Sequence, residues 1–189
     1  MKLNGSEDIR IRKTITSIQR TFCEMVCEMD YEKITVKELC RRALINKKTF
    51  YVYYETLDCL LKEIQESYST PYIAEVKNYK LPKDAEQLVR AFFEFSARQD
   101  EAYEKITIAA SYHGIRSEMI NKVMLETIGK GYPYAKAGIS DFQSIIQYRF
   151  VSETCLMIYE EWIHEQKKTS LEDVIKLAES LIMDGMNGN

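Results

Sequence analysis

The sequence predicts an all-α fold of about nine helices. Three observations support this: apolar residues recur at three- and four-residue steps over long stretches, alternating patterns typical of strands are few, and the 189 residues include only seven glycines and three prolines. An apolar content of 46% is ample for a buried core. We expect two domains, a small one over residues 1–55 and a larger helical one over residues 56–189.

The first helix is expected from about Ser6 to about Glu28, followed by a turn at residues 30–33. Its apolar stripe, which would support the next two helices, consists of Ile11, Ile15, Ile18, Phe22, Met25, Val26 and Met29. The basic side chains on its other faces are Arg10, Arg12, Lys13 and Arg20. They fit either a solvated surface or, near the start of the helix, one or two contacts to phosphate.

Residues 34–54 carry two helix starts eleven residues apart. Thr35 and Glu38 fit a capping box, and Asn46 fits a second N-cap. The connection at residues 43–46 is so short that the second helix must cross the first at a steep angle. This is the geometry of a helix-turn-helix.

The second helix of this motif is too short to bury all of its aromatic rings on one side. Phe50 and Tyr54, four residues apart, are expected in the core. The side chains left available to a groove are Lys47, Lys48, Thr49, Tyr51, Val52 and Tyr53. Because cations and hydroxyl groups of this kind suit phosphates and base edges, we interpret the motif as a DNA-binding element.

Caps and breakers delimit the remaining helices. We expect helices over residues 56–69, 84–97, 101–112, 117–128, 140–166 and 169–185, with Pro71 ending or kinking the first of them and a loop at 129–134. The expected caps are Thr56, Ser140 with Gln143, and Thr169 with Glu172. The last two helices are too apolar to be fully solvated. Pairing with a second copy in a four-helix interface would bury them, so we expect a homodimer through these helices.

Charge is unevenly distributed along the chain. The net charge is −3, yet residues 1–63 carry 12 Lys+Arg against 10 Asp+Glu, whereas residues 64–189 carry 14 against 19. A weakly positive module on an acidic body fits a small footprint on phosphates, because affinity for the DNA backbone depends on local charge.

Other classes of protein are disfavoured. No stretch approaches the roughly 18 to 20 apolar residues of a membrane span and the N-terminus has no apolar signal core, so a soluble cytoplasmic protein is expected. The five cysteines lack C-x-x-C spacing, which favours buried reduced thiols over redox sensing, and we expect no metal and no cofactor. Adjacent acids at 100–101 and 160–161 point to different helix faces and no hydrolase or phosphate-loop motif occurs, so we expect no catalytic residues and no enzyme.

Residues 11–61 resemble the N-terminal domain of the tetracycline-repressor-like (TetR) family of bacterial transcription regulators. The resemblance rests on the striped first helix, the run I-T-V-K-E-L-C-R-R-A, the tight turn, the run N-K-K-T-F-Y-V-Y-Y and a fourth helix that opens with a leucine pair. The late run W-I-H-E-Q-K-K-T-S-L-E-D is similar to family members common in Firmicutes. The resemblance implies a homodimer with a three-helix head that binds a palindromic double-stranded DNA operator. It also implies a helical body whose small-molecule effector relieves repression.

The DNA contacts that the resemblance implies fall on Thr35, Lys37, Asn46, Lys47, Lys48, Thr49, Tyr51 and Tyr53. Three positions depart from the family pattern. Leu44 replaces the turn glycine, which implies either a turn without positive φ or a mildly strained one. Lys48 replaces a small residue and adds a phosphate or guanine contact, and Leu57 replaces a lysine that would contact phosphate.

We expect the effector pocket among aromatic and soft side chains of the body, namely Phe92, Phe95, Tyr112, His113, Tyr148 and Met157. Ordinary core packing is the alternative for each of them. The alternative function is a TetR-like protein that has lost DNA binding and acts through a protein partner. Leu57 and the acidic body favour this alternative. The residues that argue against it are Thr35, Lys47, Thr49 and Tyr51.

Overall fold

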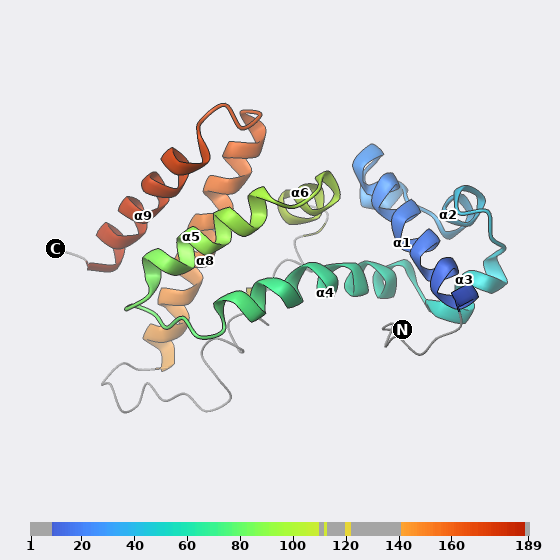
Figure 1. Ribbon diagram of the computed structural model, residues 1–189, viewed down its shortest axis with the longest axis horizontal. Coiled ribbons are helices and arrows are strands. Elements are labelled where there is room, and N and C mark those ends of the chain that lie inside the picture. Colours follow the sequence, from blue (N-terminus) through green and yellow to red (C-terminus); the bar gives the residue numbers. More distant parts are fainter. Residues whose placement is uncertain (1–8, 110–111, 113–119, 122–140, 188–189) are drawn as a thin grey trace. The chain divides into compact units, whose positions relative to one another are not determined.

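The computed structural model describes residues 9–109, 112, 120–121 and 141–187, and every regular element within them is helical (Figure 1). The elements are α1 (Ile9–Glu28), the 3-10 helix η1 (Tyr31–Lys33), α2 (Val36–Arg42), α3 (Lys47–Tyr53), α4 (Leu57–Val76), α5 (Ala85–Ala97), α6 (Glu101–Ile108), α8 (Asp141–His164) and α9 (Leu171–Asn187). The predicted all-α class is confirmed, and eight α-helices in these residues come close to the expected number. Among the described helices, none is both long enough and apolar enough to cross a membrane.

The chain forms two compact units. The first unit comprises residues 1–68 and 101–115, and the second comprises residues 69–100 and 116–189. α4 contributes its residues up to Tyr68 to the first unit and the remainder to the second. The predicted division between residues 55 and 56 does not coincide with the boundary of these units and stays a prediction.

The core of the first unit collects one face from each of its helices. The stripe predicted for α1 is buried there, with Ile15, Ile18, Phe22, Met25 and Val26 all inside. Phe50 and Tyr54 are both buried, as expected, and Ile106 of α6 joins the same cluster together with Tyr112. The core thus holds one side of α2 and α3, and the opposite side of each helix remains exposed.

α4 continues through Pro71 to Val76, so the prediction that this helix would end near Ser69 is wrong. A proline inside a helix removes one N–H donor, here the one that would serve the Ser67 carbonyl. Ser67 and Pro71 are both exposed, so water can replace that donor. The buried side chains of Ser69 and Val76 anchor the helix on both sides of the proline.

Two other boundaries differ from expectation. α6 ends at Ile108, and Tyr112 lies beyond it in a turn in which its N–H donates to the Ala109 carbonyl at 3.1 Å. α9 is capped by Ser170, whose Oγ accepts from the Asp173 N–H at 3.2 Å, one residue later than the predicted cap. Thr169 is used otherwise, because its carbonyl accepts a hydrogen bond from the indole of Trp162 at 2.8 Å.

The remaining sequence-based boundaries are either matched or untested. Thr56 caps α4 as predicted, since its Oγ1 accepts from the Cys59 N–H at 3.1 Å. The bounds of α5 and α8 lie within two residues of those expected. The expected loop at 129–134 and the cap at Ser140 lie outside the described residues, as does nearly all of the helix expected at 117–128.

The second unit is built from α5, α8 and α9, which pack pairwise against one another. Its core includes Phe93 of α5, Tyr159 of α8 and Ile175 of α9. Arg90 of α5 ties α9 to this core through ion pairs with Glu172 at 3.0 Å and with Glu179 at 3.4 Å. These ion pairs join α9 to α5.

Candidate nucleic-acid interface

A threonine cap begins α2. Thr35 Oγ1 accepts from the Glu38 N–H at 3.2 Å, as predicted. In place of the reciprocal bond of a capping box, the Glu38 carboxylate accepts from the guanidinium groups of Arg41 and Arg42. These hydrogen bonds, first that of Arg41, lower the pKa of Glu38 to about 2.

The turn between α2 and α3 is a Schellman motif with Leu44 at its left-handed position. The Ile45 N–H donates to the Cys40 carbonyl at 3.0 Å, and the Leu44 N–H donates to the Arg41 carbonyl at 3.4 Å. Leu44 has a φ of 55°, so the mildly strained turn is the alternative that the chain adopts. Its side chain is 92% exposed and packs against nothing that would offset the strain.

Asn46 starts α3 as the predicted N-cap. Its Oδ1 accepts from the Thr49 N–H at 2.8 Å and from the Thr49 hydroxyl at 3.1 Å. The first role of Asn46 and Thr49 is therefore structural, because their side chains form the cap at the start of α3. With the helix started here, Phe50 points into the core and the opposite side of α3 points outward.

The outward side of α3 carries Lys47, Lys48, Tyr51 and Val52, all of them exposed. Val52 is apolar and yet 68% exposed. Of the other predicted contact residues, Thr35 and Lys37 are exposed at the start of α2, Thr49 is half-buried, and Tyr53 is half-buried against the core cluster. The helix-turn-helix thus brings the predicted residues onto the start of α2 and along α3.

Eight of the cations in the first unit fall into two groups. Four of them pair with acids, in the ion pairs Arg20–Glu24, Lys33–Asp30, Arg41–Glu38 and Arg42 with both Glu38 and Glu28. The other four form no ion pair with any residue that the structure describes, and they are Lys13, Lys37, Lys47 and Lys48. Three of these four are lysines predicted to contact DNA. Their charge is available to phosphate without the loss of an intramolecular partner.

Two of the unpaired lysines, Lys47 and Lys48, occupy the first turn of α3, which contains no acid. The free N–H groups at a helix start carry partial positive charge, so a cation there typically costs about 0.3 to 1 kcal/mol. Neither lysine recovers this cost through a contact within the described fold. Residues that break a local rule without a compensating contact are candidates for function.

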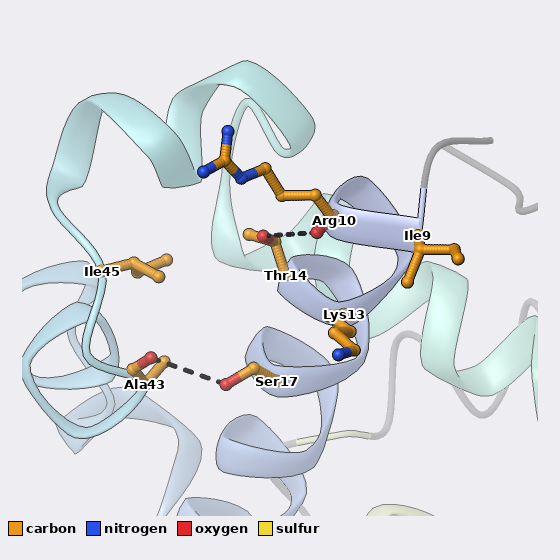
Figure 2. A pocket seen from close by; sticks show the side chains of 7 residues that line it. All are labelled: Ile9, Arg10, Lys13, Thr14, Ser17, Ala43 and Ile45. Carbon is orange, nitrogen blue, oxygen red and sulfur yellow. Dashed lines mark hydrogen bonds between the residues drawn. The ribbon is translucent and has the colours of Figure 1, made fainter.

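An open depression of about 600 Å³ lies between α1 and the turn of the motif (Figure 2). Ser17, one of its lining residues, donates to the Ala43 carbonyl at 3.5 Å and so joins α1 to the turn. Arg10 and Lys13 also line the depression. The basic side chains near the start of α1 therefore lie beside the turn of the motif.

The residues predicted for an effector pocket are brought together only in part. Phe92 and Phe95 of α5 belong to an aromatic cluster with Tyr72 of α4, whose ring centroid lies 6.4 and 5.2 Å from theirs. Phe92 also lies 5.8 Å from the ring of Tyr159. Tyr148 is buried on α8 in the same unit.

The other predicted pocket residues lie elsewhere. Tyr112 packs in the core of the first unit, with its ring centroid 5.4 Å from that of Tyr31. Its buried hydroxyl is close to α1, and burial raises the pKa of this group. Met157 is exposed on α8, and His113 lies outside the described residues.

α8 and α9 present a strip of exposed apolar side chains, which we call the α8–α9 strip. It consists of Phe142, Ile146, Phe150, Met157, Leu177 and Leu181. The spacing of these residues by four or seven places them on one face of each helix. Phe150 crosses onto α9, where a Cβ added to Gly185 would lie 2.5 Å from its ring. Exposed apolar side chains that gather on one face of a helix are candidates for an interaction surface.

The cysteines do not form a site in the described residues. Cys40 and Cys155 are buried, Cys23 and Cys27 are half-buried, and Cys59 is exposed, so burial holds for only some of them. Burial raises the pKa of the Cys40 and Cys155 thiols, which disfavours the reactive thiolate. No group of three or more His, Cys, Asp or Glu in the described part of the chain could hold a metal ion.

Comparison with solved structures places this geometry in a known fold. The chain is similar over 92% of its length to 95% of a TetR transcriptional regulator from Streptococcus agalactiae, with 22% identity and a TM-score of 0.63. It is similar over 89% of its length to 96% of the transcriptional regulator FadR from Bacillus subtilis in complex with stearoyl-CoA, with 15% identity and a TM-score of 0.64. The fatty acid degradation regulator FadR from Bacillus halodurans gives 14% identity and a TM-score of 0.62, with 95% of this chain and 97% of that one covered.

The fold and the motif together define an all-α helix-turn-helix protein. Its fold is that of the TetR-type transcription regulators, as the sequence resemblance predicted. No protein-family model matches the chain, and neither does any curated protein.

Proposed function

We propose that the protein is a sequence-specific, DNA-binding transcription regulator that acts as a homodimer and is not an enzyme. The observation that carries this proposal is the outward side of α3. Its two lysines have no acid partner among the residues that the structure describes, and their charge opposes the partial positive charge at the start of the helix. Together with Lys37 at the start of α2, they offer phosphate contacts on either side of a helix of the right size for the major groove.

Dimerisation follows from the small size of this interface. One two-turn helix reads only a few base pairs, whereas two heads about 34 to 36 Å apart read a palindrome on one face of the duplex. The α8–α9 strip is the surface proposed for pairing, because two copies would bury both strips in a four-helix interface.

The proposed regulator responds to an effector that binds in the second unit. The aromatic cluster of Tyr72, Phe92 and Phe95 suits an apolar molecule, and Phe92 and Tyr72 are only half-buried. The similar structure of the Bacillus subtilis FadR holds stearoyl-CoA, which supports an apolar ligand without identifying one here. An effector that favours a conformation with poorly spaced heads would lower DNA affinity by roughly 5- to 150-fold. The proposed mode of regulation is therefore repression that the effector relieves.

Selection of duplexes from a random library, followed by gel-shift assays, tests the proposal. We expect a palindromic operator whose binding weakens steeply with salt. Tyr51→Ala should abolish specific binding and leave melting and dimerisation nearly unchanged, because the Tyr51 ring is more than half exposed. Failure to bind any duplex at low salt would favour the alternative, a protein of this shape that acts through a protein partner.

A further inference from the structure

Val52 is an apolar side chain on the surface proposed to face DNA. It is 68% exposed, whereas Phe50, two residues earlier, is completely buried. Val52 lies one turn after Lys48 on the outward side of α3, so it contributes nothing to the core cluster. Its β-branched side chain is also a poor choice for a short helix. Neither folding nor helix formation explains a valine here.

The chemistry of valine limits what it can recognise in DNA. Its side chain has no donor, no acceptor and no charge, so it can bind neither phosphate nor the polar base edges. The apolar group that B-DNA presents in the major groove is the C5-methyl group of thymine. A helix that places Lys48 near the bases also brings Val52 there, because residues one turn apart are separated by about 6 Å, or roughly two base-pair steps.

We propose that Val52 is a specificity-determining residue that reads the C5-methyl group of one thymine in each operator half-site. This inference rests on the proposed function and adds to it a named base at a named side chain. It predicts a thymine within about two base pairs of the position that Lys48 contacts.

The test uses the selected operator with each thymine replaced in turn by deoxyuridine, which pairs identically and lacks only the methyl group. Gel shifts compare the wild type, Val52→Ala and the matched control Lys48→Gln. One symmetric replacement should weaken wild-type binding by about fourfold per half-site, which is the effect of losing one buried methyl group. Val52→Ala should bind the thymine operator more weakly and show no further loss with deoxyuridine. Lys48→Gln should keep the full deoxyuridine effect.

Each result decides the matter. Loss of the deoxyuridine effect in Val52→Ala alone supports the inference. An operator without thymine in its half-sites, no effect of any replacement on the wild type, or an equal effect on the wild type and Val52→Ala would overturn it while leaving DNA binding in place. Absence of specific binding to any duplex would overturn the proposed function and this inference together. Because Val52 is exposed, thermal melting should confirm that its variant folds normally.

Discussion

At the scale of single residues, Leu44 shows how the turn between α2 and α3 forms without glycine. The two hydrogen bonds of the Schellman motif are both made, so the backbone reaches the left-handed conformation despite the side chain. For a residue other than glycine this conformation costs roughly 1 to 2 kcal/mol. The turn is therefore formed at the expense of stability.

Leu44→Gly should stabilise the protein by about 0.5 to 1 kcal/mol. Relief of the left-handed strain outweighs the added freedom of glycine in the unfolded chain, and the exposed leucine has no packing to lose. Chemical denaturation measures the change. Leu44→Ala is the matched control and should show little gain, because alanine keeps the strain. Equal stability of the two variants would contradict this explanation.

Glu38 makes the free energy of unfolding depend on pH in the acid range. Its pKa of about 2 lies below that of an unfolded glutamate, so its contribution to stability is complete above about pH 4.5 and is lost as the pH falls towards 2. Glu38→Gln should therefore lose less stability than the wild type over this interval. Thermal melting across the interval measures it, and parallel curves for the two proteins would argue against the ion pairs with Arg41 and Arg42.

At the scale of elements, Pro71 leaves one helical hydrogen bond of α4 unmade. Pro71→Ala should restore the donor to the Ser67 carbonyl and raise stability by about 1 to 3 kcal/mol, since the exposed proline ring has little packing to lose. Circular dichroism during denaturation measures the change. Lower stability of Pro71→Ala would mean that the proline is required for the path of the helix.

The elements also show what the sequence can predict. The starts of α2, α3 and α4 were predictable because Thr35, Asn46 and Thr56 cap residues only three positions away. The continuation of α4 past Pro71 depends on burial at Val76, a tertiary contact that no local pattern contains.

The candidate site, too, could be predicted from the sequence only in part. Its residue types and their exposure on α3 followed from helical periodicity. Which cations pair with acids could not be predicted in this way, because one partner of Arg42 is Glu28, fourteen residues earlier in the chain. The place of Tyr112 in the first unit is likewise set by its long-range contact with Tyr31.

At the scale of the whole molecule, binding to a palindromic operator requires two copies of the chain. Leu181→Asp should disrupt the dimer, because a carboxylate in the middle of the α8–α9 strip would be buried without a partner. Analytical ultracentrifugation should show a monomer, and operator affinity should fall by at least tenfold. Lys168→Asp, in the exposed connection between α8 and α9, is the control and should remain dimeric. A dimeric Leu181→Asp would place the interface elsewhere.

The salt dependence of operator binding tests the central claim most directly, since the logarithm of affinity falls against the logarithm of salt concentration by about 0.9 per phosphate contact. The double variant Lys47→Gln/Lys48→Gln removes four unpaired charges from a dimer and should reduce the slope by roughly three to four units. The matched double variant Arg20→Gln/Lys33→Gln removes the same number of charges, but these are already paired with acids in the fold. It should leave the slope nearly unchanged. Equal slopes for the two variants would contradict the claim that the outward side of α3 binds DNA.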